Sequence, residues 1–368
     1  MLPAADHGAR PRHPSSLDSR APAAGGRPAW RPAPAASALS LPHLVRVRRS
    51  GGCGSLPGDA ERKELPLTAN LGLFTTPGPT SRSYFSQRLR LHYVDWGNPD
   101  RPPLLLLHGG RDHCRNWDWT AEALREEWHV IAPDLRGHGD SQWSPDGSYT
   151  MAGYIYDLAQ LIHQQRLAPV TIIAHSLGGN IALRYAGVYP EAVARLVAIE
   201  GLGPSAPALA ERRARSIAER MDEWIREQRA FAGRLPRRYA SIEDAFRRMQ
   251  EENPHLSAAQ ARHLTAQGVN QNEDGTYSWK FDNYVRAWPP YDMSSRDIAQ
   301  LWSRIACPTL LLWGKESPSG DPVEDGRARP FRHATVVGLE GAGHWLHHDR
   351  LAEFLRVVRD FLGRPGAG

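Results

Sequence analysis

Cysteine is scarce in this 368-residue sequence, which has only Cys53, Cys114 and Cys307. The number is odd and no two cysteines have CxxC spacing, so the sequence argues against a disulfide framework and against a zinc site built on cysteine pairs. We therefore expect a reducing compartment, the cytoplasm, for the folded part of the chain, and no metal.

Long apolar runs are also missing from the sequence. No run approaches the roughly 20 residues that a membrane-spanning helix needs. No apolar core of the kind found in secretory signals follows the first residues. We expect neither membrane insertion nor secretion.

An excess of charge of one sign is confined to the first residues of the chain. Residues 1–64 hold ten basic and five acidic residues, whereas the remainder holds 35 of each. The neutral remainder gives no electrostatic reason to expect nucleic acid or anionic lipid as a partner. Residues 1–64 are rich in Pro, Ala, Gly, Ser and Arg, which predicts a disordered tail. An over-extended start or a targeting segment is the alternative interpretation, although Asp6 and Asp18 fit a targeting segment poorly.

Beyond the tail, strand patterns alternate with helix patterns. Strands are expected at 88–96, 103–107, 129–133, 170–174, 196–199, 308–313 and 334–337, and helices at 121–128, 154–165, 180–188 and 350–362. Such alternation predicts a mostly parallel sheet covered by helices on both faces.

The alternation is interrupted by a helical and charged stretch at residues 205–300, which we interpret as a lid. The expected organisation is a tail at 1–64, a core formed by 65–204 and 301–368, and a helical cap at 205–300 between the two core segments.

The stretch VTIIAHSLGGN at residues 170–180 carries the clearest chemical signal. Its β-branched run predicts a buried strand that breaks at Ser176, where a helix pattern begins. Small residues, Ala174 and Gly178, stand two places on either side, as a strained strand-to-helix turn requires. The pattern predicts a nucleophile elbow, with alanine in place of its first glycine and Ser176 as the nucleophile.

A nucleophilic serine needs a base and donors for the oxyanion. The segment GAGHW at 341–345 places His344 just after the last expected strand, where it can act as the base. The oxyanion hole of an elbow enzyme uses the N–H after the nucleophile, here Leu177, and one from the loop after an early strand. In the HGG loop at 108–110 we expect Gly110 to supply that second N–H.

Taken together, the motifs HGG, DLRGHGDS, AHSLGG and GAGHW resemble the α/β-hydrolase superfamily over about residues 83–363. They are most similar to the branch with a helical cap after the sixth strand, which includes epoxide hydrolases, haloalkane dehalogenases and many esterases. The resemblance implies the α/β-hydrolase fold. Epoxide hydrolases and dehalogenases of this branch carry an aspartate at the elbow, so Ser176 indicates acyl transfer or a related reaction.

The third member of the triad departs from the family pattern. The family places an aspartate three residues beyond the glycine that ends the seventh strand, and this position holds Ser317. Glu200, at the end of the sixth strand, matches the place of the acid in some haloalkane dehalogenases. A carboxylate just after a buried strand is costly unless it is paired, and His344 would be its partner. We favour Glu200, with Glu316 or Asp321 as alternatives.

Other polar groups are expected to have packing roles. These are Asp134, Arg136 and His138 in the DLRGHGDS turn, Cys114 as a small packed side chain, and His347 and His348 as surface or packing groups. Arg111, His175 and Trp279 are the candidates for contact with substrate.

The sequence thus predicts a serine hydrolase that cleaves a small or medium apolar carboxylic ester or lactone through an acyl-enzyme, without metal or organic cofactor. C–C bond hydrolysis and cofactor-free perhydrolysis use the same triad and remain alternatives. Because Ser317 replaces the usual acid, a non-catalytic ligand-binding homologue is the alternative from another class. The expected partner is a small-molecule substrate, and the expected state is a monomer or homodimer.

Overall fold

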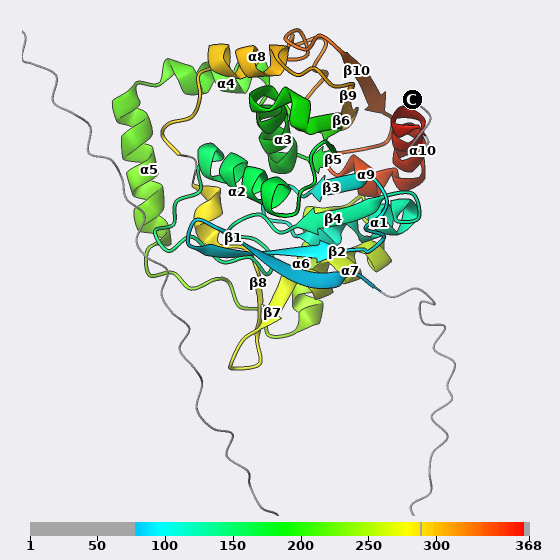
Figure 1. The fold of residues 1–368 in the computed structure, drawn as a ribbon. Helices are drawn as coiled ribbons and strands as arrows, with labels where there is room; N and C mark the ends of the chain where they lie inside the picture. The colour runs from blue at the N-terminus through cyan, green and yellow to red at the C-terminus, as the bar shows by residue number, and fades with distance from the viewer. Residues whose placement is uncertain (1–77, 288, 364–368) are drawn as a thin grey trace, which may run out of the picture. The chain divides into compact units, whose positions relative to one another are not determined.

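The computed structural model describes residues 78–287 and 289–363, so the expected tail lies outside the described residues. An eight-stranded sheet with the order β1-β2-β4-β3-β5-β6-β9-β10 runs through the described part (Figure 1). Its strands are β1 (Thr80–Ser86), β2 (Leu89–Asp95), β3 (Pro103–Leu107), β4 (His129–Pro133), β5 (Val170–His175), β6 (Val193–Ile199), β9 (Thr309–Gly314) and β10 (Ala334–Leu339). From β4 to β10 every neighbouring pair is parallel, which confirms the predicted fold class.

The first strand, β1, is absent from the sequence prediction. It pairs with β2 in an antiparallel hairpin. Only Tyr84 and Ser86 of its seven residues are buried, so β1 lacks the apolar pattern by which the other strands are recognised. Pairing with β2 explains its extended form better than its own side chains do.

Helices cover both faces of the sheet, and each face has its own apolar core. The covering helices are α1 (Asp118–Leu124), α2 (Met151–Gln164), α3 (Leu177–Val188), α8 (Ser295–Ser303), α9 (Leu346–Asp349) and α10 (Leu351–Leu362). One core includes buried side chains of α2, α3 and α8, and the other includes buried side chains of α1, α9 and α10. This two-sided burial is why β3 and β5 have near-continuous apolar sequences.

A long insertion separates β6 from β9, and its expected end at residue 300 falls inside α8 (Ser295–Ser303), whose Trp302 belongs to the core of the sheet. Its elements before α8 are α4 (Ala206–Ala214), α5 (Ile217–Phe231), α6 (Ile242–Glu252), α7 (Ala258–Gly268), β7 (Val269–Gln271), β8 (Tyr277–Trp279) and the 3-10 helix η3 (Asn283–Arg286). The insertion is therefore mainly helical, as expected, but it also contains an antiparallel β7–β8 hairpin.

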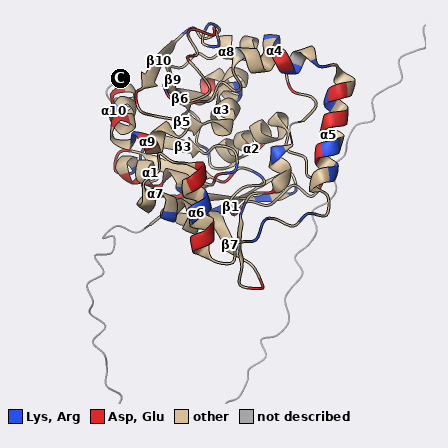
Figure 2. Ribbon diagram, turned by 180° about the vertical axis from the view of Figure 1, so that it is seen from behind, with Lys and Arg blue, Asp and Glu red and all other residues tan. Residues whose placement is uncertain are grey.

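The insertion's helices begin at well-formed caps. Ser216, Ser241 and Ser257 form capping boxes at the starts of α5, α6 and α7. No residue of α5 is buried, and acidic and basic side chains alternate along it (Figure 2).

Within the described part of the chain, no helix has both the length and the apolar character needed to cross a bilayer.

Candidate active site

Ser176 stands at a sharp turn between β5 and α3. Its backbone has φ = 50° and ψ = −114°, a conformation that non-glycine residues seldom adopt. The Ser176 N–H is held by the Ile199 carbonyl at 2.8 Å. Such a strained residue costs of the order of 1–3 kcal/mol and persists only when its surroundings fix it.

The contact between α3 and β3 requires glycine after the serine. A Cβ atom on Gly178 would lie 2.6 Å from the His108 carbonyl oxygen and 2.7 Å from that of Leu107. Both neighbours are backbone, so neither can move aside. The sequence spacing of the elbow thus brings the first turn of α3 against the loop that follows β3.

His344 lies in the loop after β10 and faces the serine. Its Nε2 is 3.0 Å from Ser176 Oγ, and its Nδ1 is 3.5 Å from Glu200 Oε2. The Glu200 side chain is fully buried, whereas the His344 side chain is 42% exposed. The structure thus brings together the three residues that the sequence analysis favours for the triad.

Glu200 follows β6 directly, with a positive φ of 52°. The Gly314 N–H donates to Oε1 at 2.8 Å, and the Ser317 hydroxyl donates to Oε2 at 3.0 Å. Burial raises the pKa of Glu200, but the interaction with His344 and the hydrogen bonds that the carboxylate accepts lower it overall. Glu200 is therefore ionised at neutral pH.

Ser317 has a role that the sequence analysis missed, because it treats this position only as the place of an absent aspartate. The position of Ser317 in the sequence could have indicated this role. Ser317 is three residues beyond Gly314, where members of the family carry the acid that contacts the catalytic base. Here the same position supplies a hydrogen bond to an acid from β6.

The two alternative acids lie elsewhere. The Glu316 carboxylate is 3.8 Å from His255 Nε2, and its side chain is 54% exposed. Asp321 accepts a hydrogen bond from the Val323 N–H at 2.7 Å within its own loop. Neither therefore takes the position that Glu200 occupies beside His344.

The expected oxyanion donors lie close to the nucleophile and to each other. Leu177 is the first residue of α3, so its N–H has no acceptor within the helix. A Cβ atom on Gly109 would be 3.2 Å from Ser176 Cβ, and one on Gly110 would be 3.8 Å from Leu177 Cδ2. The loop after β3 therefore borders both the serine and the first residue of α3.

Comparison with known proteins agrees with this fold. The sequence profile of the alpha/beta hydrolase fold matches residues 102–351. The chain belongs to the α/β-hydrolase family. It is 30% identical over 268 residues to the sn-1-specific diacylglycerol lipase ABHD11 of Xenopus laevis, covering 71% of this chain and 80% of the lipase.

Two further proteins are similar to this chain. The serine hydrolase-like protein of Danio rerio is 26% identical, with 73% of this chain and 83% of that protein covered. The solved structure of an esterase from Mycobacterium tuberculosis superposes with a TM-score of 0.63 at 22% identity, covering 78% of this chain and 92% of the esterase. At this identity the superposition concerns the fold alone.

A cavity of about 2030 Å³ opens at the elbow of this α/β hydrolase. Ser176 and His344 line it, as do the three candidates for substrate contact, Arg111, His175 and Trp279. The Trp279 indole N–H donates to the Tyr239 hydroxyl at 3.1 Å, which fixes the ring in the cavity wall.

His175 has a different environment from the other two candidates. It is only 1% exposed, and its Nε2 donates to the His344 carbonyl at 2.9 Å. Burial, and then the neighbouring His344, lower the pKa of His175 far below the ordinary value, so its ring is neutral. The ring therefore supports the loop of His344, and its Nε2 proton is already used.

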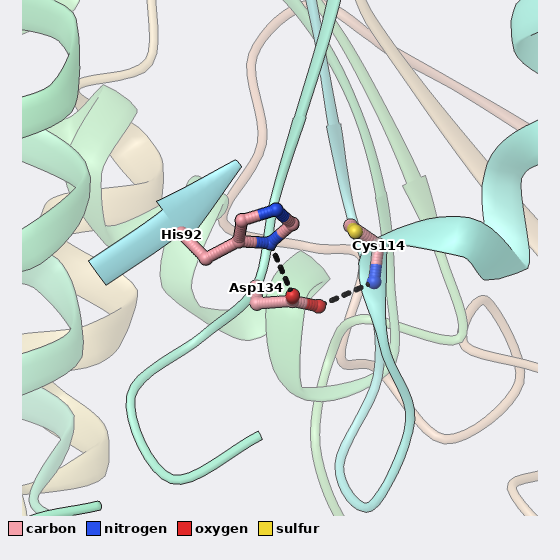
Figure 3. A group of neighbouring side chains, drawn as sticks. All are labelled: His92, Cys114 and Asp134. Atoms are coloured by element: carbon pink, nitrogen blue, oxygen red, sulfur yellow. Dashed lines mark hydrogen bonds and ion pairs between the residues drawn. The ribbon is translucent and has the colours of Figure 1, made fainter. Parts of the chain in front are cut away.

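One buried group has the residue types of a metal site. His92, Cys114 and Asp134 offer ligand atoms within 4.8 Å of one another (Figure 3). However, Asp134 already accepts bonds from His92 Nδ1 at 2.7 Å, the Cys114 N–H at 2.6 Å and the Asp140 N–H at 2.9 Å. His92 Nε2 is likewise bonded to Ser81 Oγ.

The thiol of this group also argues for a structural role. Burial is the main cause that raises the pKa of Cys114 well above its ordinary value, whereas a metal ligand must be a thiolate. Asp134 directly follows β4, and its carboxylate accepts the N–H of Cys114, the first residue of the 3-10 helix η1 (Cys114–Trp117). This hydrogen bond connects the end of β4 to the segment that follows the HGG loop. This matches the scaffold and packing roles expected for Asp134 and Cys114.

Proposed function

We propose that the protein is a serine hydrolase that cleaves a carboxylic ester or lactone through an acyl-enzyme. The observation that carries the proposal is the 3.0 Å approach of His344 Nε2 to Ser176 Oγ at a strained elbow that faces a large cavity. Esterase and lipase are also the activities named for two of its relatives.

Each of these groups has a defined role in the proposed reaction. His344 Nε2 takes the hydroxyl proton as Ser176 Oγ attacks the ester carbonyl carbon, and the carbonyl oxygen becomes an oxyanion. The N–H groups of Leu177 and Gly110 stabilise that oxyanion, each donor being worth roughly 3–4 kcal/mol. Ionised Glu200 stabilises the imidazolium that forms on His344.

Collapse of the tetrahedral intermediate breaks the bond to the alkoxide leaving group, which takes the proton from His344. A water molecule then attacks the acyl-enzyme while His344 accepts one of its protons. Release of the carboxylic acid restores the Ser176 hydroxyl.

The size of the cavity bears on the substrate. Pockets for drug-sized ligands measure about 300–1,000 Å³, and this cavity, at about 2030 Å³, is larger. Its wall includes apolar side chains of the insertion, among them Met249, Trp279 and Phe281. An ester with a medium-sized apolar portion fits this lining, and the insertion would act as its lid.

The first test is labelling of the full-length protein with a fluorophosphonate probe. We expect covalent labelling of the wild type at Ser176, detected by mass spectrometry, and none in Ser176→Ala. Nitrophenyl esters of increasing acyl length should be hydrolysed by the same wild-type preparation. A folded wild type that neither labels nor turns over esters would refute the proposal.

The C–C hydrolase alternative is separated by a second substrate. Vinylogous diketones are cleaved by that class of enzyme, so turnover of diketones without turnover of esters would reject the esterase assignment. Hydrolysis of esters alone would support it.

A further inference from the structure

Two buried polar atoms on α3 have no hydrogen-bond partner among the described residues. They are Asn180 Oδ1 and Arg184 Nε. Arg184 is only 3% exposed. Both residues line the cavity that contains Ser176. Buried polar groups of folded proteins are nearly always hydrogen-bonded, so a molecule in the cavity is the natural partner for this acceptor and this donor.

The two residues continue a row that begins at the nucleophile. The Asn180 N–H donates to the Ser176 carbonyl at 3.0 Å, so the helical path starts at the serine itself. Positions 176, 180 and 184 are each four residues apart and therefore lie on the same face of the helix. Because helical side chains lean toward the N-terminus, the side chain of Arg184 lies over the turn that carries Asn180. The unpartnered donor and acceptor are thus neighbours on the cavity wall.

The charge of Arg184 is already balanced. Its Nη1 and Nη2 donate to the two carboxylate oxygens of Asp292 at 2.6 and 2.8 Å, which leaves the Nε–H as the unused donor. The group that this N–H binds therefore needs no negative charge. Arg220 Nε and Ser295 Oγ, which line the same cavity, are also buried without a partner among the described residues. Arg220 Nη1 donates to the Pro290 carbonyl at 3.2 Å, so the polar wall continues beside the segment that carries Asp292.

We propose that Asn180 and Arg184 bind an uncharged hydroxyl group on the substrate whose ester lies at Ser176. This inference rests on the proposed function and specifies its substrate class. A hydroxyl group is both a donor and an acceptor, so it can donate to Asn180 Oδ1 and accept from the Arg184 Nε–H. A substrate with a methyl group at this point leaves both buried atoms unpaired, and such a site discriminates against it.

The helix sets the distance between the hydroxyl group and the scissile bond. At a rise of about 1.5 Å per residue, Asn180 lies about 6 Å and Arg184 about 12 Å from Ser176 along the axis of α3. The hydroxyl group is therefore separated from the ester carbonyl by a spacer of the same order. The predicted substrate is an ester whose acyl or alcohol portion carries a hydroxyl group at the end of a chain.

The test uses two series of esters of increasing chain length. In one, methyl esters of ω-hydroxy acids carry the hydroxyl group on the acyl portion; in the other, acetate esters of diols carry it on the alcohol portion. Each is compared with an ester of equal length that ends in a methyl group, and acid release is followed by titration at constant pH. In one of the two series the wild type should show a kcat/KM at least about tenfold higher for the hydroxylated ester, in line with a hydrogen bond to a charged group.

Two variants test the residues themselves. Asn180→Ala removes the acceptor and places a good helix former in α3. Arg184→Lys keeps a positive charge beside Asp292 but has no counterpart of the Nε–H. Each should lower the ratio of kcat/KM for the hydroxylated ester to that for the methyl-ended ester by about 5–20-fold, mainly through KM. Labelling of Ser176 by the fluorophosphonate probe should persist in both, which shows that the elbow is intact.

The matched controls repeat the same two changes elsewhere in the cavity wall. Asn253 lines the cavity, but its Nδ2 already donates to the Met249 carbonyl at 3.0 Å. Arg296 also lines the cavity and is exposed. Asn253→Ala and Arg296→Lys should therefore keep the wild-type ratio.

The outcomes distinguish this inference from the proposed function. If the wild type hydrolyses methyl-ended esters and labels at Ser176 but prefers the hydroxyl group in neither series, the inference is overturned and the proposed function stands. An unchanged ratio in both Asn180→Ala and Arg184→Lys would overturn it as well, and so would a wild-type preference for a terminal carboxylate over the hydroxyl group. A folded protein that neither labels nor hydrolyses any ester contradicts both.

Discussion

The Ser317 hydroxyl donates a 3.0 Å hydrogen bond to Glu200 Oε2. The direction is fixed because the ionised carboxylate has no proton to donate, and Ser317 Oγ in turn accepts the Ser319 N–H at 3.3 Å. The residue at the place of the family's usual acid thus supports a carboxylate supplied by another strand. Loss of the aspartate from the end of β9 therefore leaves His344 with a buried acidic neighbour.

Glu200→Gln should lower kcat for ester hydrolysis by about 10⁴-fold, by analogy with neutralisation of a triad acid elsewhere. The amide cannot stabilise the imidazolium that forms on His344. Steady-state kinetics measure the effect, and Glu316→Gln is the control because its carboxylate lies beside His255. If Glu316→Gln lost as much activity as Glu200→Gln, our assignment of the acid would be wrong.

Ser317→Ala should moderately lower both the free energy of unfolding and kcat. It removes one donor to a buried carboxylate, which costs about 1–3 kcal/mol. Urea denaturation should therefore show a lower midpoint, and kcat should fall much less than in Glu200→Gln.

In a Glu200→Ala background, Ser317→Asp should recover part of the lost kcat, because position 317 faces the Glu200 carboxylate. Failure of the double variant to exceed Glu200→Ala would indicate that an acid at 317 cannot reach His344.

The strained backbone of Ser176 should lower the free energy of unfolding, although the elbow that it forms is needed for activity. Ser176→Gly should abolish turnover yet raise the free energy of unfolding by about 1 kcal/mol relative to Ser176→Ala, because glycine adopts positive φ without strain. The comparison with alanine removes the hydroxyl from both variants. Equal urea midpoints for the two variants would show that the turn stores little strain.

How far the site could be predicted depends on how local each feature is. The elbow was predictable because a buried strand, the serine and its small neighbours follow one another in sequence. The choice among Glu200, Glu316 and Asp321 depends instead on how the ends of β6, β9 and β10 meet in space. Sequence position favoured Glu200, and the loop geometry places it beside His344.

Features that depend on distant packing were beyond the sequence. β1 carries no apolar pattern of its own and forms by pairing with β2. For His347 and His348 the sequence left surface and packing roles open, and the structure confirms packing: they are 0% and 4% exposed, with His347 stacked on Trp117 and His348 against Trp119.

Buried neutral histidines make the fold sensitive to acid. Burial lowers the pKa of His108 to about 3, that of His138 to about 4 and that of His348 to about 3, against an ordinary value of 6.5. Because the pKa of each histidine is lower in the folded state, the unfolded chain binds protons more readily. As far as these histidines determine it, the free energy of unfolding is highest above about pH 6.5 and decreases as the pH falls below that value. Each group contributes about 1.4 kcal/mol per pH unit, or about 4 kcal/mol per unit for the three between pH 6.5 and 4. Asp112, whose pKa burial raises, acts in the opposite direction. Burial also lowers the pKa values of His113, His175 and His347, and these three groups add to the slope.

Urea unfolding at a series of pH values tests this sensitivity, and His348 offers the sharpest variant. Its two ring nitrogens are buried without hydrogen-bond partners among the described residues, and the ring packs against Trp119 and Trp345. His348→Leu should therefore keep the packing and reduce the slope of unfolding free energy against pH by about 1.4 kcal/mol per unit. His163→Leu, which removes an exposed histidine of α2, is the matched control. A slope as steep in His348→Leu as in the wild type would mean that the acid sensitivity arises elsewhere in the buried cluster.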